Sequence, residues 1–258
     1  MSEPLLELRG VNKSFGVAHV LHDVDFAVYP GTVTALVGDN GAGKSTLTKI
    51  IAGIYTRDTG DYLFEGNQVN VHGPRDVAAL GVDIVYQDLA LCENLDIVQN
   101  MFLGREERKG LLLDEVSMES RARETLASLS VRTVKSVRQS VASLSGGQRQ
   151  TVAIAKAVLW NSKVVVLDEP TAALGVAQTR QVLDLVRRLA DRGLGVVLIS
   201  HNMGDVFEVA DRITALYLGR VAADVPSKEL THSQVVELIT AGRSGALGIS
   251  ENPATASV

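Results

Sequence analysis

GDNGAGKS, residues Gly38 to Ser45, follows the spacing G-x-x-x-x-G-K-[ST], which is typical of loops that bind phosphate groups. The apolar run Val33 to Val37 precedes it as a buried strand would, and helical periodicity follows from Ser45 to Ala52. In such a loop, backbone N–H groups surround the phosphates, Lys44 adds a positive charge and the Ser45 hydroxyl can bind Mg²⁺. The alternative is an incidental glycine-rich turn, against which the flanking strand and helix argue.

A second apolar run ends in two carboxylates. VVVLDE, Val164 to Glu169, predicts a buried strand that ends at Asp168. Burying a carboxylate costs free energy unless it has a partner, and a metal ion is a suitable one. We expect Asp168 to hold Mg²⁺, directly or through water, and Glu169 to orient and polarise an attacking water. The alternative is a solvated strand end with two surface acids.

Strands and helices alternate around these two segments. Residues 5 to 37 show strand patterns, for example the period-2 alternation of Val24, Phe26 and Val28. The strand patterns at 163–170 and 194–201 enclose a helical pattern, which predicts a crossover between parallel strands.

The segment between about Gln87 and Trp160 is charged and rich in helix-forming residues. Within it, Ala122, Leu126 and Leu129 share one helical face. The predicted fold class is therefore α/β. It comprises a P-loop NTPase core of mostly parallel sheet flanked by helices, an antiparallel β portion at the N-terminus and an inserted α-helical subdomain at about 88–158. The domain is predicted to span 5–240, and the small, polar residues 241–258 are predicted to form a disordered tail.

Composition excludes several classes of protein. A formal net charge of −5 argues against a general nucleic-acid binder, and the single cysteine, Cys92, rules out an internal disulfide. The N-terminus lacks the pattern of a signal peptide, and no apolar run approaches the roughly 20 residues that cross a bilayer. Any association with a membrane is therefore expected to go through another protein.

A third segment, SLSGGQRQTVAIAKA at 143–157, places Gly146 and Gly147 at the start of an amphipathic helix. Free N–H groups at a helix N-terminus attract anions, and a pair of glycines lets a ligand lie against the backbone. This position predicts a second contact with a phosphate.

The order of these motifs carries a family resemblance. Phe15, the phosphate loop, Gln87 in VYQD, LSGGQ, VVVLDEPTAAL and His201 occur in this order along the chain. Together they resemble the ATP-binding subunit of ABC transporters, over residues 5 to about 240. The resemblance implies ATP and Mg²⁺ as cofactors and a homodimer, in which LSGGQ of one copy covers the ATP held by the other.

The resemblance also assigns site residues. It implies that Phe15 stacks on adenine, that Gln87 senses Mg²⁺ and water, and that His201 contacts the γ-phosphate. The alternatives are a core phenylalanine at 15 and a packed or surface histidine at 201. Catalysis is assigned to Lys44, Gln87, Glu169 and His201, and Mg²⁺ to Ser45, Gln87 and Asp168. ATP is assigned to Phe15, Gly38, Asp39, Asn40, Gly41, Ala42, Gly43, Lys44, Ser45, Thr46, Ser145, Gly146, Gly147 and Gln148.

One segment departs from the family pattern. Many relatives carry Ser-Ala-Leu-Asp where this chain has Ala172 to Gly175. The missing carboxylate removes an expected contact across the dimer and puts coupling between the two ATP sites in doubt.

The segment Asp88 to Glu106 resembles ATPases of bacterial monosaccharide importers of the ribose, xylose and fructose type. This implies two transmembrane permease subunits, an extracytoplasmic solute-binding protein and a peripheral position on the cytoplasmic face of the inner membrane. Two alternatives within the family are transport of another small solute and a soluble ABC ATPase that acts on DNA or ribosomes. A phosphate-loop kinase or GTPase is a third, but it would leave LSGGQ without a role.

Overall fold

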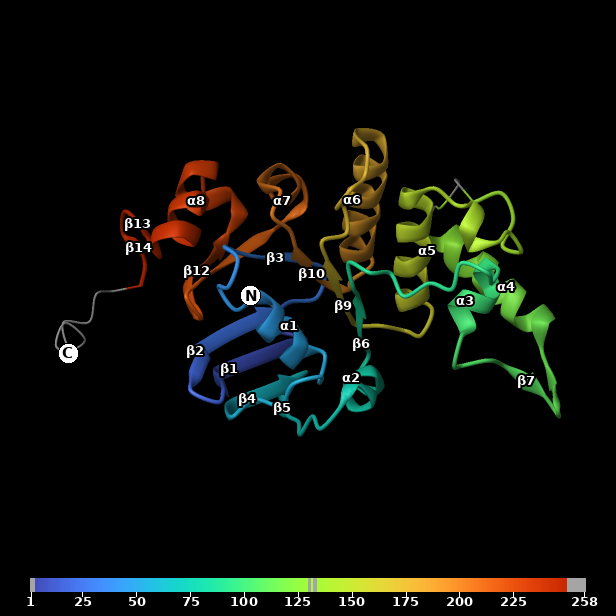
Figure 1. Ribbon diagram of the computed structural model, residues 1–258, viewed down its shortest axis with the longest axis horizontal. Helices are drawn as coiled ribbons and strands as arrows, with labels where there is room; N and C mark the ends of the chain where they lie inside the picture. The colour runs from blue at the N-terminus through green and yellow to red at the C-terminus, as the bar shows by residue number, and fades with distance from the viewer. Residues whose placement is uncertain (1–2, 130, 132–133, 250–258) are drawn as a thin grey trace.

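The computed structural model describes residues 3–129, 131 and 134–249, and two sheets form its framework. Figure 1 shows helices on both sides of the larger sheet, with the smaller sheet beyond one of these layers. In spatial order the larger sheet contains β12 (Arg220–Pro226), β11 (Arg212–Tyr217), β3 (Val33–Gly38), β10 (Gly195–Ile199), β9 (Val164–Asp168) and β6 (Val82–Val85). The smaller sheet contains β2 (Ala18–Val28), β1 (Leu6–Phe15), β4 (Thr59–Phe64) and β5 (Asn67–Gln68).

The directions of the strands agree with those predicted from the sequence. In the larger sheet β11, β3, β10, β9 and β6 are parallel, and β12 pairs antiparallel with β11. The smaller sheet is antiparallel, as predicted for the N-terminal part. The helices are α1 (Lys44–Ile51), α2 (Pro74–Leu80), α3 (Ile97–Phe102), α4 (Glu115–Ser128), α5 (Gly146–Val158), α6 (Val176–Asp191), α7 (Met203–Val209) and α8 (His232–Ala241). Two single 3₁₀ turns lie at Val141–Ser143 and Ser227–Glu229.

Burial on both faces explains the apolar runs in the central strands. Along β9, Val164 and Val166 pack in the cluster that contains α1 and the smaller sheet. Val165 and Leu167 point to the opposite face and pack against α5 and α6. Parallel strands covered on both faces require continuous rather than alternating apolar residues. The same arrangement places the phosphate loop and the paired carboxylates at one edge of the sheet.

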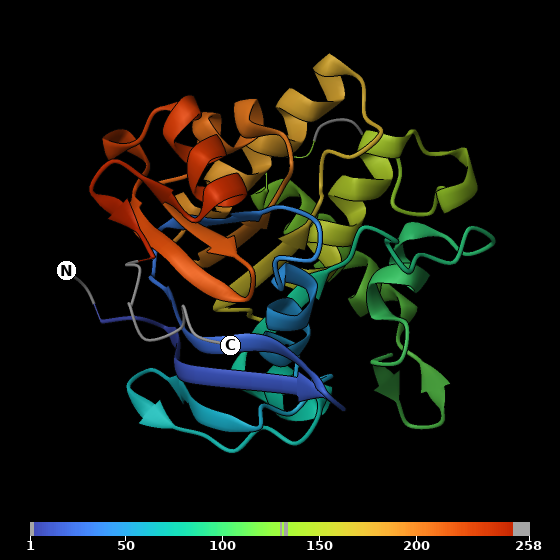
Figure 2. The same ribbon diagram turned by 60° about the vertical axis from the view of Figure 1, so that its left-hand side comes forward.

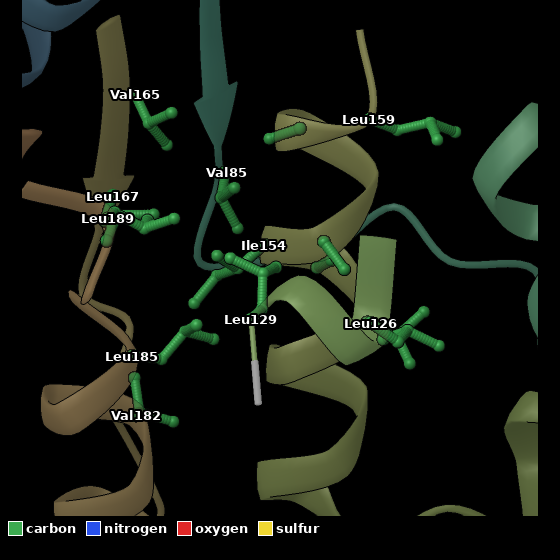
Figure 3. Packing of buried hydrophobic residues seen from close by; sticks show 14 of the residues in the cluster. Val85, Leu126, Leu129, Ile154, Leu159, Val165, Leu167, Val182, Leu185 and Leu189 are labelled. Carbon is green, nitrogen blue, oxygen red and sulfur yellow. The ribbon is translucent and has the colours of Figure 1, made fainter. Parts of the chain in front are cut away.

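Helices α3, α4 and α5 lie beyond β6 at one end of the larger sheet (Figure 1). Ala122, Leu126 and Leu129 are buried, so the predicted helical face is confirmed. Figure 3 shows Leu129 beside Ile154 of α5 and nearer than Leu126 to the side chains of α6. A short hairpin, β7 (Arg108–Lys109) and β8 (Leu112–Leu113), precedes α4. The boundaries of an inserted subdomain at 88–158 remain a prediction.

The prediction of a disordered tail from residue 241 differs from the structure. Here β13 (Arg243–Ser244) and β14 (Leu247–Gly248) form a hairpin beside α8. The Ser244 hydroxyl donates a hydrogen bond to the Glu237 carboxylate, and the backbone N–H of Ile249 donates to the Gly242 carbonyl at 2.9 Å. These contacts order a segment whose composition gave no sign of it. Residues 250–258 lie outside the described residues.

Over the described ranges, none of the helices combines the length and the apolar character needed to cross a membrane.

Candidate functional site

The site lies where the parallel strands β3, β10, β9 and β6 end. Leu36 is opposite Ile199, and Ile199 is opposite Asp168, so these positions line up across three strands. Because parallel strands share one carboxyl edge, the phosphate loop after β3, His201 after β10, Glu169 after β9 and Gln87 after β6 emerge along one line.

The phosphate loop needs glycine at two positions. Gly43 precedes α1 with φ 106°, and a Cβ there would lie 2.7 Å from Leu21 Cδ2. At Gly38 a Cβ would lie 2.7 Å from the Leu216 carbonyl oxygen. The remaining loop turns outward, so that Asp39, Asn40, Gly41 and Ser45 are exposed while Ala42 is buried and Thr46 is half-buried. The loop therefore presents its backbone and the first turn of α1 to a ligand.

Lys44 lies beneath this loop. Its ammonium donates hydrogen bonds to the carbonyls of Gly38 at 2.7 Å and Asp39 at 3.0 Å, and the residue is only 8% exposed. Burial lowers the pKa of Lys44, and the carboxylates of Glu169, Asp39 and Asp168 act in the opposite direction. The lysine is thus already near the two acids at the end of β9.

Glu169 has an unusual backbone. Its φ is 51°, in the left-handed region that a residue with a side chain rarely adopts, and its N–H donates to the Ile199 carbonyl at 3.0 Å. Burial raises the pKa of Glu169, with His201 the next cause and opposing it. Burial likewise raises the pKa of Asp168, and Lys44 opposes that shift. The sequence predicted both acids at this edge but contained no signal for the strained backbone.

His201 faces Glu169. Its Nε2 lies 3.3 Å from Glu169 Oε1, and its side chain is 53% exposed whereas that of Glu169 is 19% exposed. Within the described ranges Glu169 Oε1 is buried and has no hydrogen-bond partner, because the approach of the histidine does not have hydrogen-bond geometry. A buried carboxylate oxygen without a partner is costly, so the surroundings of this oxygen favour a nearby proton donor or cation.

Gln87 and Phe15 lie at the margins of the site. Gln87 is exposed just after β6, the strand that neighbours β9. Phe15 ends β1 and is 42% exposed, with its ring edge-on to Tyr55 at a centroid distance of 5.1 Å. This exposure does not fit the alternative of a core phenylalanine and leaves a ring face available for stacking.

The second predicted phosphate contact is at the N-terminus of α5. Ser145 caps the helix by accepting from the Gln148 N–H at 3.3 Å, and the Gln148 side chain accepts from the Ser145 N–H at 2.9 Å. Ser145 and Gly146 are exposed. The strands β10, β9 and β6 lie between α1 and α5 in Figure 1, so one chain does not bring Ser145–Gln148 to its own phosphate loop.

The glycine pair also has a packing role that the sequence did not reveal. A Cβ at Gly147 would lie 3.0 Å from Gln178 Cβ on α6, and a Cβ at Gly146 would lie 3.1 Å from Leu174 Cδ2. The glycines therefore allow α5 to approach α6 and the turn before it.

Comparison with known proteins agrees with this geometry. A family model described as ABC transporter matches residues 21–172, which include the phosphate loop, LSGGQ and the paired acids. The chain belongs to the ABC transporter family. Its ATP-binding fold and its resemblance to that family's ATPase subunits are thereby confirmed.

Curated relatives are similar over most of the chain. The fructose import ATP-binding protein FrcA of Rhizobium meliloti is 46% identical over 248 residues, 93% of this chain and 95% of that protein. The xylose/arabinose import ATP-binding protein XylG of Sulfolobus acidocaldarius is 43% identical, over 96% of this chain and 98% of that protein. The ribose import ATP-binding protein RbsA 2 of Escherichia coli O157:H7 is 37% identical, over 92% of this chain but only 47% of its own length.

Solved structures share the fold. The cbiO1 subunit of Clostridium perfringens, part of the ABC transporter complex cbiONQ, superposes with a TM-score of 0.77 at 26% identity, covering 88% of this chain and 90% of that chain. A nucleotide-free ATP-binding cassette from an ABC transporter gives a TM-score of 0.78 at 23% identity, over 93% and 96% of the two chains.

Proposed function

We propose that the chain is the ATP-hydrolysing subunit of an ABC importer for a monosaccharide. The observation that carries this proposal is the alignment of the phosphate loop, Asp168, Glu169 and His201 along one sheet edge. The sugar importers to which the chain is similar support the choice of solute class.

The residues around the phosphate loop suit a nucleoside triphosphate with Mg²⁺. Ser45, Asp168 and Gln87 offer hard oxygen donors, which Mg²⁺ prefers, and the buried Glu169 Oε1 that has no hydrogen-bond partner among the described residues marks a site that favours positive charge. Bound there, Mg²⁺ would neutralise charge on the phosphates. Lys44 and the N-terminus of α1 would bind the terminal phosphates, and Phe15 would stack on the base.

Glu169 would act on the attacking water. Its carboxylate is fixed by the strained backbone and by burial, so it can accept a hydrogen bond from water and take its proton. His201 would contact both the Glu169 carboxylate and the γ-phosphate and so keep them aligned, because its Nε2 already faces the Glu169 carboxylate. Together these two side chains position the water.

A second copy would complete the site. Ser145 and Gly146 are exposed at a helix N-terminus that lies away from the loop of its own chain, with Gly147 buried and Gln148 half-buried behind them. In a head-to-tail homodimer this N-terminus would contribute donors to the free side of the γ-phosphate. ATP would then join the copies, and hydrolysis would release them.

The membrane partners are two permease subunits, with an extracytoplasmic solute-binding protein on the other side. A groove of about 250 Å³ between the sheet and the helical part is lined by apolar Leu89, Met101 and Trp160 and by the charged Asp83, Arg105 and Lys156. Because its two cations outnumber its one acid, it suits a short helix with an acidic residue, supplied by a permease at the cytoplasmic face.

Light scattering of Glu169→Gln tests the dimer. With ATP and Mg²⁺ this variant is expected to run as a dimer because it binds ATP without cleaving it, and without nucleotide it is expected to run as a monomer. A strictly monomeric result with ATP would contradict the head-to-tail homodimer joined by ATP. Recovery of a permease with the tagged protein from native membranes tests the transport assignment separately.

A further inference from the structure

A buried carboxylate on α7 bonds to the turn that carries Glu169. Asp205 is 6% exposed, and its Oδ2 accepts a hydrogen bond from the Thr171 hydroxyl at 2.6 Å. Thr171 follows Glu169 by two positions, and Asp205 follows His201 by four. The bond therefore closes a ring of contacts around the pair in which His201 Nε2 and Glu169 Oε1 are 3.3 Å apart.

Both arms of this ring are well ordered by local hydrogen bonds. On the His201 side, the Asn202 N–H donates to the buried Ser200 hydroxyl at 3.0 Å, and the Asn202 side chain caps α7 by accepting from the Gly204 N–H at 2.9 Å. On the Glu169 side, the Ala172 N–H donates to the Glu169 carbonyl at 3.1 Å. Thr171 thus lies inside a hydrogen-bonded turn that begins at Glu169.

Two residues of the turn have a left-handed backbone conformation, Glu169 with φ 51° and Ala173 with φ 58°. Strained backbone of this kind persists only where the surroundings hold it. The described residues include just one hydrogen-bond partner for the Asp205 side chain, the Thr171 hydroxyl. Burial of a carboxylate against a single hydroxyl is costly, even though the first turn of α7 offsets part of that cost.

We propose that Asp205 is a positioning residue, which acts through the Thr171 hydroxyl to hold Glu169 at its working distance from His201. This inference rests on the role proposed for Glu169. It assigns no contact between Asp205 and the nucleotide. Loss of the bond should therefore lower the rate of hydrolysis and leave the affinity for ATP nearly unchanged.

The test compares Thr171→Val with Thr171→Ser and Asp205→Leu with Asp205→Asn. Valine and leucine remove the hydrogen bond, whereas serine keeps the donor and asparagine keeps an acceptor. We expect kcat to fall at least tenfold in the first of each pair, because displacement of a reacting group by about 1 Å can cost 10²-fold. The dissociation constant for ATP, measured by calorimetry, should stay within threefold. The conservative variants should keep at least half of the rate.

Glu208→Ala, on the exposed side of the same helix, is the matched control and should behave as the wild type. If Asp205→Leu does not fold, Thr171→Val, which has almost the same shape as the natural residue, carries the test. Wild-type turnover in Thr171→Val, or an equal loss in Thr171→Ser, would overturn the inference. Normal turnover in Glu169→Gln would instead overturn the role of Glu169 itself, so the two failures are distinguishable.

Discussion

At the scale of single residues, Lys44 combines burial with charge. Its ammonium is held by two loop carbonyls, at 2.7 and 3.0 Å, in the place where a phosphate would arrive. Lys44→Ala should abolish tight ATP binding, because it removes the positive charge closest to the terminal phosphates. Calorimetric titration with ATP and Mg²⁺ measures this. Lys163→Ala removes an exposed lysine paired with Glu65 and should bind as the wild type. Unchanged affinity in Lys44→Ala would exclude the assigned contact.

The raised pKa of Glu169 predicts the pH at which ATPase activity is lost on the acidic side. Burial raises this pKa above the ordinary value of 4.5, and a base must be ionised to act. Turnover is therefore lost as the pH falls through the raised pKa, and the midpoint of the acid limb of kcat/KM, which reports the enzyme without nucleotide, should lie above 4.5. A pH–rate profile at ATP concentrations far below KM measures it. A midpoint at or below that value would contradict the burial of the reacting carboxylate.

The same shift predicts a gain in stability for Glu169→Gln. A carboxyl group whose pKa is raised by folding favours the folded state below its unfolded pKa, and this contribution is lost as the pH rises through the folded pKa. At neutral pH the buried charge therefore destabilises the fold, so Glu169→Gln should melt at a higher temperature than the wild type. The difference should shrink as the pH approaches 4.5, which thermal melts across this range would reveal.

Sequence predicted the residues of the site better than their geometry. Asp168 and Glu169 could be placed because an apolar strand ends abruptly at two acids, and parallel strands share an edge. The left-handed φ of Glu169 and its approach to His201 depend on contacts with the neighbouring strand. The local sequence pattern around Glu169 carries no information about those contacts. The Thr171–Asp205 bond was missed for the same reason, since its partners are 34 positions apart.

At the scale of elements, the packing of α5 on α6 depends on Gly147. A Cβ there would lie 3.0 Å from Gln178 Cβ, an atom next to the α6 backbone that cannot swing away. Overpacking of this kind costs about 1–3 kcal/mol, and the gain in helix propensity from glycine to alanine offsets up to about 1 kcal/mol. Gly147→Ala should therefore lower the free energy of unfolding by about 1 kcal/mol.

Gly146→Ala is the matched control. Its Cβ would meet Leu174 Cδ2 at 3.1 Å, the end of a flexible side chain that can move. Urea unfolding of both variants should show the larger loss for Gly147→Ala. Equal stability of the two would mean that the approach of α5 to α6 does not require glycine at 147.

Elements with strong periodicity were predicted well, and elements held by distant contacts were not. The strands β3, β9 and β10 and the buried face of α4 follow directly from apolar patterns. The hairpin of β13 and β14 has a small, polar sequence and forms because it docks beside α8, where Leu247 joins the local cluster. Composition indicated disorder because it does not report such docking.

At the scale of the whole molecule, the distance between α5 and α1 within one chain has a functional consequence. The phosphate loop, Asp168, Glu169 and His201 are assembled in a single copy, whereas the N-terminus of α5 lies elsewhere (Figures 1 and 2). A site shared between two copies would make turnover depend on association, so specific ATPase activity should fall on dilution. Assays across a hundredfold range of protein concentration would show this.

The substitution Ser145→Arg separates ATP binding by a single chain from formation of the homodimer. Ser145 is exposed at the cap of α5, so a bulky cation there is tolerated by the single chain but would meet the nucleotide surface of a second copy. In the Glu169→Gln background, we expect Ser145→Arg to bind ATP with unchanged affinity and to remain monomeric with ATP and Mg²⁺. Removing the cap also weakens α5, by about 1 kcal/mol, so Ser145→Ala is the control and should still dimerise. A dimer of normal affinity in Ser145→Arg would show that this helix N-terminus does not face the partner's ATP.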